Sequence, residues 1–170
     1  MKEEGSGKGN FVDKVNSELS KNSKIYHSAQ IFSNVTMDEV RGKIVVISPN
    51  GINSSYKYNG WGDNPECRSF SLGGSTAVAQ DEYKAVTETE KMTAIENYYN
   101  NVWRNYSGQN IVYINFTSCV GPACPKLVAK EVNKSFEKFV NENKTKKFGI
   151  VNMDNPSSSL IELIYSLNKS

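Results

Sequence analysis

Alternating apolar and polar positions predict four β-strands in this chain of 170 residues. The most regular of them covers residues 111–118. Val112, Ile114 and Phe116 share one side of it, and the other side is only partly polar. A strand that is apolar on most of both sides is typical of a parallel sheet covered by helices. Three further apolar runs predict strands at 43–48, 76–81 and 148–154.

Between the strands, apolar residues recur at helical spacing. Phe11, Val15 and Leu19 are four residues apart and predict a short helix that ends near residue 20. Two other stretches have no such period. We therefore expect irregular chain at 21–40 and a long loop at 50–75, which is rich in Asn, Gly, Ser and Tyr.

Three helix starts can be recognised by their residue types. Thr87 and Glu90 have the spacing of a capping box. Pro125 suits the first position of a helix, and Asn155 with Pro156 resembles a cap followed by a first helical residue. The apolar faces of these three helices are Met92, Ile95, Tyr99 and Val102; Val128, Val132, Phe136 and Val140; and Leu160, Ile161, Ile164 and Leu167.

The order of predicted elements is helix, strand, loop, strand, helix, strand, helix, strand, helix. Alternation of this kind indicates a parallel sheet with right-handed crossovers, so we expect residues 1–170 to form a single α/β domain. In a parallel sheet the carboxyl ends of the strands share one rim, where ligands bind. The polar residues at three strand ends are Gln80 and Asp81, Asn115 and Thr117, and Asn152 and Asp154.

Charge and cysteine content narrow the classes of function. A net charge of +2 is too small to indicate a nucleic-acid partner. One histidine and three cysteines without a CxxC pair do not indicate a zinc site, and we expect neither metal nor cofactor. Cys119 and Cys124 are either bridged across their loop or free. The first residues are charged and no apolar run approaches the ~20 residues of a membrane span, so we expect neither a signal peptide here nor a transmembrane helix.

Five blocks of sequence resemble a known family. They are Arg41-Gly-Lys-Ile-Val-Val-Ile47, Trp61-Gly-Asp-Asn64, Gln80-Asp-Glu-Tyr-Lys84, Tyr113-Ile-Asn-Phe-Thr-Ser118 and Gly149-Ile-Val-Asn-Met-Asp154. In order and spacing they resemble the second half of bacterial-type phosphatidylinositol-specific phospholipase C. The resemblance implies the C-terminal half of a parallel (β/α) barrel of the phospholipase C type, with about four strands and flanking helices.

The resemblance also implies roles for individual residues. Tyr83 matches the tyrosine on which the inositol ring stacks, and Asp81 matches a carboxylate that accepts inositol hydroxyls. Lys2 and Glu4 are similar to a substrate-binding element at the end of the family's fourth strand. Asp154 matches the aspartate that orients the general-base histidine; a carboxylate there fixes the tautomer of an imidazole. Without the resemblance, both aspartates would be read as strand-end or helix-capping residues.

Several family features are missing from this chain. The two catalytic histidines and the adjacent arginine belong to the family's first three strands, which have no counterpart here. His27 is the only histidine and matches no catalytic position. Pro49 stands where the family has an inositol-binding arginine. The loop 119–125 lacks the tryptophan with which secreted relatives touch the lipid interface.

Two hypotheses of function remain open. In the first, the chain belongs to a metal-independent enzyme that cleaves phosphatidylinositol to diacylglycerol and a cyclic inositol phosphate at a membrane surface. The full-length parent would then be extracellular or membrane-peripheral, and the isolated chain inactive. In the second, the chain is a non-catalytic remnant that binds a polyol or associates with itself. Self-association is expected because the inward faces of Ile44, Val46, Val112 and Ile114 would have no opposing wall.

Overall fold

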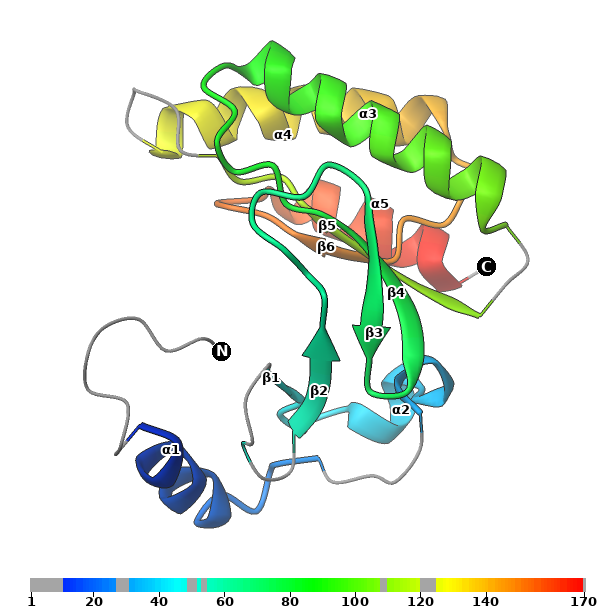
Figure 1. The fold of residues 1–170 in the computed structure, drawn as a ribbon. Coiled ribbons are helices and arrows are strands. Elements are labelled where there is room, and N and C mark those ends of the chain that lie inside the picture. Colours follow the sequence, from blue (N-terminus) through cyan, green and yellow to red (C-terminus); the bar gives the residue numbers. More distant parts are fainter. Residues whose placement is uncertain are drawn as a thin grey trace. The chain divides into compact units, whose positions relative to one another are not determined.

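The computed structural model describes residues 11–26, 31–48, 52, 55–107, 110–119 and 125–169. In chain order the elements are α1 (Phe11–Ser20), η1 (Phe32–Asn34), α2 (Met37–Val40), β1 (Val46–Ser48), β2 (Ser55–Asn59), β3 (Arg68–Leu72), β4 (Ser75–Gln80), α3 (Glu88–Asn105), β5 (Ile111–Phe116), α4 (Pro125–Glu142), β6 (Ile150–Asn152) and α5 (Ser158–Lys169). Figure 1 shows them coloured along the sequence. The strand order is β1-β2-β3-β4-β5-β6.

The chain divides into two compact units, which are described separately. The N-terminal unit comprises Met1–Gly60 and Phe70–Thr76, and the C-terminal unit comprises Trp61–Ser69 and Ala77–Ser170. The expectation of one α/β domain stays a prediction.

A buried apolar cluster lies among the described residues of the N-terminal unit. Ile25, Val46 and Ile52 are buried together, and the apolar side of α1 packs against them through Phe11, Val15 and Leu19. The periodicity of these three α1 residues therefore predicted both the helix and its buried side correctly.

The stretch 50–75 is not a structureless loop, so that prediction was wrong. It contains β2 and β3, which pair antiparallel through Tyr58 with Leu72 and Asn59 with Ser71. Gly73 and Gly74 then join β3 to β4 with φ values of +52° and +80°, as a tight hairpin turn requires. The sheet is therefore only partly parallel: β1 pairs parallel with β2, and β5 with β6.

The expectation of irregular chain at 21–40 was also partly wrong. It holds η1 and the single turn α2, which begins at a capping box. The Glu39 backbone N–H donates to the Thr36 hydroxyl at 3.3 Å, and the Thr36 backbone N–H donates to the Glu39 carboxylate at 2.7 Å. Reciprocal bonds of this kind satisfy donors that a helix start leaves free, which is why so short a turn is stable.

The C-terminal unit has a larger, aromatic core. Helices α3 and α4 run side by side (Figure 1), and α4 also contacts α5. The two tyrosines at the centre are fully buried but satisfied. The Tyr98 hydroxyl donates to the Val78 carbonyl at 2.8 Å, and the Tyr99 hydroxyl donates to the Phe148 carbonyl at 3.0 Å. Around them lie Val102, Val132, Phe136, Val140, Leu160 and Ile164.

The predicted helix starts were right in two cases and wrong in one. Helix α3 follows the Thr87 capping box, and α4 begins at Pro125. Helix α5 does not begin at Pro156: it starts two residues later, after Ser157, whose hydroxyl accepts from the Leu160 backbone N–H at 3.2 Å. In the described part of the chain, no helix is long and apolar enough to cross a bilayer.

Candidate functional site

The candidate site lies where β4 ends, inside the C-terminal unit. Gln80 is the last residue of β4 and is fully buried. Its side-chain N–H₂ group donates to the Asn115 side-chain oxygen at 2.8 Å and to the Phe116 carbonyl at 2.9 Å. These bonds link the ends of β4 and β5. Two of the strand ends that sequence analysis marked as polar are thus in direct contact.

A buried lysine completes this arrangement. Lys91, in the first turns of α3, is 0% exposed, and its ammonium donates to the Gln80 side-chain oxygen at 2.9 Å and to the Glu82 carbonyl at 3.0 Å. The Glu82 backbone N–H donates to the same Gln80 oxygen at 2.6 Å. Burial lowers the pKa of Lys91 to about 8, although the negative charges of Asp81, Cys119 and Glu82 act in the opposite direction.

Asp81 is half-buried directly after β4. Its backbone N–H donates to the Pro65 carbonyl at 2.7 Å. Burial is the largest effect on its carboxyl and raises the pKa. The Lys91 ammonium and a hydrogen bond from the Trp61 side chain lower that pKa, and Asp63 raises it. A buried cation and an indole N–H thus oppose the effect of burial on the pKa of this carboxyl.

Tyr83 is held in the same turn. Its backbone N–H donates to the Asp81 carbonyl at 2.9 Å, and its hydroxyl donates to the Asp63 carboxylate at 2.7 Å. That hydrogen bond is the largest cause that raises the pKa of Tyr83. The Lys84 ammonium pairs with Asp63 at 2.8 Å and lies 5.5 Å from the centre of the Tyr83 ring. Asp81 and Tyr83 are thus joined by a backbone hydrogen bond in one turn, and their roles in binding stay predictions.

Asp154 follows β6 and is exposed. The Asn133 side-chain amide donates to the Asp154 carbonyl at 2.8 Å, which anchors the backbone there. The pKa of Cys119, three residues after β5, is raised first by burial; Lys91 lowers it and Asp154 raises it. Lys91 and Asp154 therefore both lie within electrostatic reach of one thiol. The role of Asp154 stays a prediction.

The remaining expected site residues lie outside the described part of the chain. These are Lys2, Glu4 and Pro49, and the same holds for His27 and Cys124. Among the described residues, Cys119 is a free thiol.

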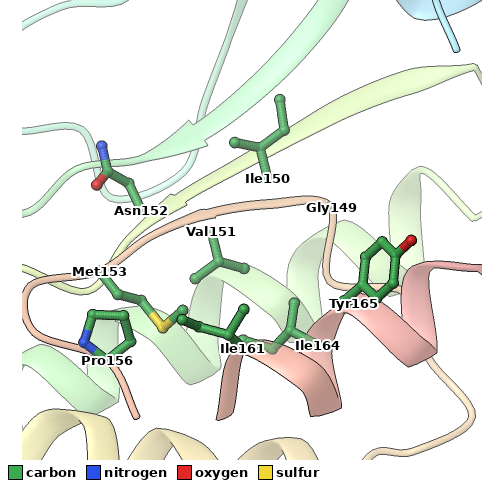
Figure 2. A pocket seen from close by; sticks show the side chains of 9 residues that line it. All are labelled: Gly149, Ile150, Val151, Asn152, Met153, Pro156, Ile161, Ile164 and Tyr165. Atoms are coloured by element: carbon green, nitrogen blue, oxygen red, sulfur yellow. The ribbon is translucent and has the colours of Figure 1, made fainter. Parts of the chain in front are cut away.

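An open hollow of about 500 Å³ lies elsewhere in the C-terminal unit, between β6 and α5. Figure 2 shows Val151, Met153 and Ile161 turned towards one another in it. Its lining is mainly apolar and does not include Asp81 or Tyr83. It is therefore separate from the cluster at the end of β4.

Three residues around Asp81 and Tyr83 were not expected at this site from the sequence: Trp61, Asp63 and Lys91. Trp61 packs edge-to-face on Phe116, with ring centres 5.6 Å apart, and its side chain also bonds to Asp81. Asp63 had no assigned role, although it stands in one of the five blocks. Lys91 carried a usable signal, because it precedes Ile95 by four residues and so occupies the buried side of α3. We call Trp61, Asp63, Gln80, Asp81, Tyr83, Lys91 and Asn115 the strand-end cluster.

Comparison with solved structures identifies the fold. No protein-family model matches the chain, and neither does any curated protein sequence. A phosphatidylinositol-specific phospholipase C from Staphylococcus aureus that contains pentafluoro-phenylalanine matches 98% of this chain at 21% identity, with a TM-score of 0.73. A second structure of the S. aureus enzyme matches 92% at 23% identity and a TM-score of 0.71. The Listeria monocytogenes enzyme matches 98% at 22% identity and a TM-score of 0.66.

The match is to part of each enzyme. The chain spans 60% of the first S. aureus structure and 61% of the Listeria enzyme. The resemblance seen in the five sequence blocks is confirmed as a resemblance of fold: this chain folds like about three fifths of a bacterial phosphatidylinositol-specific phospholipase C.

Proposed function

We propose that the chain carries the inositol-binding side of a phosphatidylinositol-specific phospholipase C. The observation that carries this proposal is that one turn at the end of β4 holds both Asp81 and Tyr83, with a backbone hydrogen bond between them. An inositol ring offers hydroxyl groups to a carboxylate and a C–H face to an aromatic ring, so this pair suits it. The shared fold supports the choice of ligand.

Cleavage of the lipid needs groups that this chain does not have. The inositol 2-hydroxyl oxygen would attack phosphorus, a base would take its proton, and the bond from phosphorus to the diacylglycerol oxygen would break as an acid protonates that oxygen. Histidines supply the acid and the base in the family, whereas this chain has one histidine in total. We therefore expect the chain alone to bind the head group without turnover, and Asp154 to orient a base histidine from outside it.

The proposal places the working protein at a lipid surface. The partner is phosphatidylinositol or another inositol-containing lipid, and the full-length protein acts as an extracellular or membrane-peripheral enzyme. Lys2 and Glu4 would add to the head-group site.

Binding of myo-inositol to the 170-residue chain, followed by NMR, tests the proposal. Asp81→Asn should weaken binding about tenfold or more, because a hydroxyl loses its bond to a charged acceptor. Asp13→Asn removes an exposed carboxylate in α1 and is the matched control. Wild-type chain that shows no binding at millimolar inositol, or Asp81→Asn that binds as tightly, would overturn the proposal. Diacylglycerol release that Asp154→Asn abolishes would overturn the expected inactivity.

A second candidate function is self-association. Three apolar side chains that line the hollow between β6 and α5 are exposed: Ile150 at 45%, Ile161 at 48% and Tyr165 at 47%. Exposed apolar groups that adjoin one another favour contact with another protein surface.

A further inference from the structure

We infer that Lys91 is a positioning residue of the inositol site: its buried ammonium holds the turn that carries Asp81 and Tyr83. The inference rests on the proposed function for its ligand and goes beyond it by assigning a role to a residue that no ligand can touch. Lys91 is 0% exposed, so it must act through its neighbours.

The contacts of Lys91 alternate with the two binding residues along the chain. Its ammonium holds the Gln80 side-chain oxygen at 2.9 Å and the Glu82 carbonyl at 3.0 Å. Asp81 lies between these two residues, and Tyr83 follows them with its backbone N–H bonded to the Asp81 carbonyl at 2.9 Å. Fixing positions 80 and 82 therefore sets the direction in which the side chains at 81 and 83 leave the turn.

The turn is also tied to the next strand through the same atoms. The Gln80 oxygen accepts from both Lys91 and the Glu82 backbone N–H, which commits its amide nitrogen to Asn115 and the Phe116 carbonyl. Only one orientation of the Gln80 amide satisfies all four contacts. Lys91 thereby selects that orientation and couples the binding turn to the end of β5.

A lysine at this place is unfavourable unless it has such a task. Burying an ammonium costs free energy, and a positive charge near the start of a helix opposes the helix dipole. Asp81, Glu82 and Cys119 oppose these costs electrostatically. Lys91 and Asp81 stabilise each other's charge, since Lys91 also favours the charged form of the half-buried Asp81 carboxyl.

Loss of the Lys91 charge should therefore disturb the site. Because the pKa of Lys91 is about 8, inositol binding by the wild type should weaken as the pH rises through that value. Besides Asp81, the titratable groups that act on Lys91 are Glu82 and Cys119. Asp63 acts in turn on Asp81. Glu90 and Asp154 act on Cys119.

The decisive variant is Lys91→Met, which keeps the length of the side chain and removes its charge. Lys134→Met, at an exposed position of α4, is the matched control. We expect Lys91→Met to weaken myo-inositol binding about tenfold at pH 7 and to remove the decline above pH 8. In an Asp81→Asn background the same change should weaken binding less, because only the part of the effect that acts through Tyr83 remains.

A second readout does not depend on inositol. The carbon-13 signal of the Asp81 carboxyl should titrate at higher pH in Lys91→Met than in the wild type, and the Glu82 and Tyr83 amide signals should move. If the wild type binds no inositol, the proposed function fails. The Asp81, Glu82 and Tyr83 signals still test whether Lys91 positions the turn. Should Lys91→Met not fold, the Glu82 and Tyr83 amides of the wild type must still shift near pH 8. The inference would be overturned if these signals stayed unchanged in Lys91→Met or in the wild type near pH 8. It would also be overturned if Lys91→Met weakened inositol binding as much in the Asp81→Asn background as in the wild type.

Discussion

At the scale of single residues, the pKa of the Asp81 carboxyl is set by opposing effects. Burial raises its pKa, and the Lys91 ammonium and the Trp61 side chain lower it. Neither partner is near in sequence: Trp61 precedes Asp81 by twenty residues, and Lys91 follows by ten. The chemistry of this carboxylate therefore depends on how β4, α3 and the stretch after Gly60 come together.

The ring of Tyr83 should matter more for binding than its hydroxyl. Tyr83→Ala removes the stacking surface and should weaken myo-inositol binding by about 1–3 kcal/mol, by analogy with aromatic stacking on nucleic-acid bases. Tyr83→Phe keeps the ring and loses the hydrogen bond to Asp63, which is at the surface, so it should cost less than ~1 kcal/mol. Calorimetric titration of both variants measures the difference. Equal losses would show that the hydroxyl, and not the ring face, holds the ligand.

Lys91 should make stability depend on pH in an unusual direction. Its pKa falls from 10.5 to about 8 on folding, so between these values the unfolded chain carries a proton that the folded chain does not. The contribution of Lys91 to the stability of the folded chain is thus lost as the pH falls through 8, and it is regained as the pH rises. Relative to Lys91→Met, the wild-type free energy of unfolding should increase by about 2 kcal/mol from pH 8 to pH 9.5. Urea unfolding at both pH values measures this difference, and a constant or shrinking gap would contradict it.

The sequence predicted the binding pair but not what supports it. Asp81 and Tyr83 were identifiable because they form one contiguous block directly after an apolar strand. Asp63 and Trp61 reach that block only through the folded chain. Lys91 was overlooked because a lysine is ordinarily solvated, and only its helical register with Ile95 marks it as buried.

At the scale of elements, local signals predicted the helices well and the short strands poorly. A capping box and a four-residue apolar period are contained within one helix, which is why α3 and α4 were placed correctly. Strands β2 and β3 are rich in Ser, Asn and Tyr, and the buried positions Tyr56, Phe70 and Leu72 are few. Their strand state depends on pairing with each other, which sequence alone does not reveal.

The approach of β6 to β5 should depend on Gly149. This residue has a φ of +66°, and a Cβ there would lie 2.7 Å from the Tyr113 carbonyl oxygen. Gly149→Ala should therefore destabilise the chain by ~3 kcal/mol or more, since backbone strain and overlap add. Gly42→Ala is the control: its φ is +71° but nothing lies within 4 Å, so only strain of about 1 kcal/mol is expected. Thermal unfolding compares the two, and equal losses would show that the contact at Gly149 relaxes.

At the scale of the whole molecule, the apolar surface is not where the sequence placed it. The expectation was that Val46 and Ile114 would lack a wall, but both are buried, at 8% and 4% exposure. Val46 packs with Ile25 and Ile52, with α1 against them. Of the four residues named, Ile44 is exposed, at 45%. Three further exposed apolar side chains, Ile150, Ile161 and Tyr165, belong to β6 and α5 and line the hollow of Figure 2.

Self-association should therefore involve the surface formed by β6 and α5. Full burial of an exposed apolar side chain is worth ~1.5–3 kcal/mol, and these side chains are half-exposed, so each stabilises a complex by about half of that before the cost of association. We expect the chain to assemble at micromolar concentration. Ile161→Lys places a charge on the hollow and should shift sedimentation towards the monomer. Leu127→Lys changes an apolar residue of α4 that is 61% exposed and should leave the assembly intact. A wild-type chain that sediments as a monomer across this range, or equal effects of the two variants, would show that this surface does not join copies of the chain.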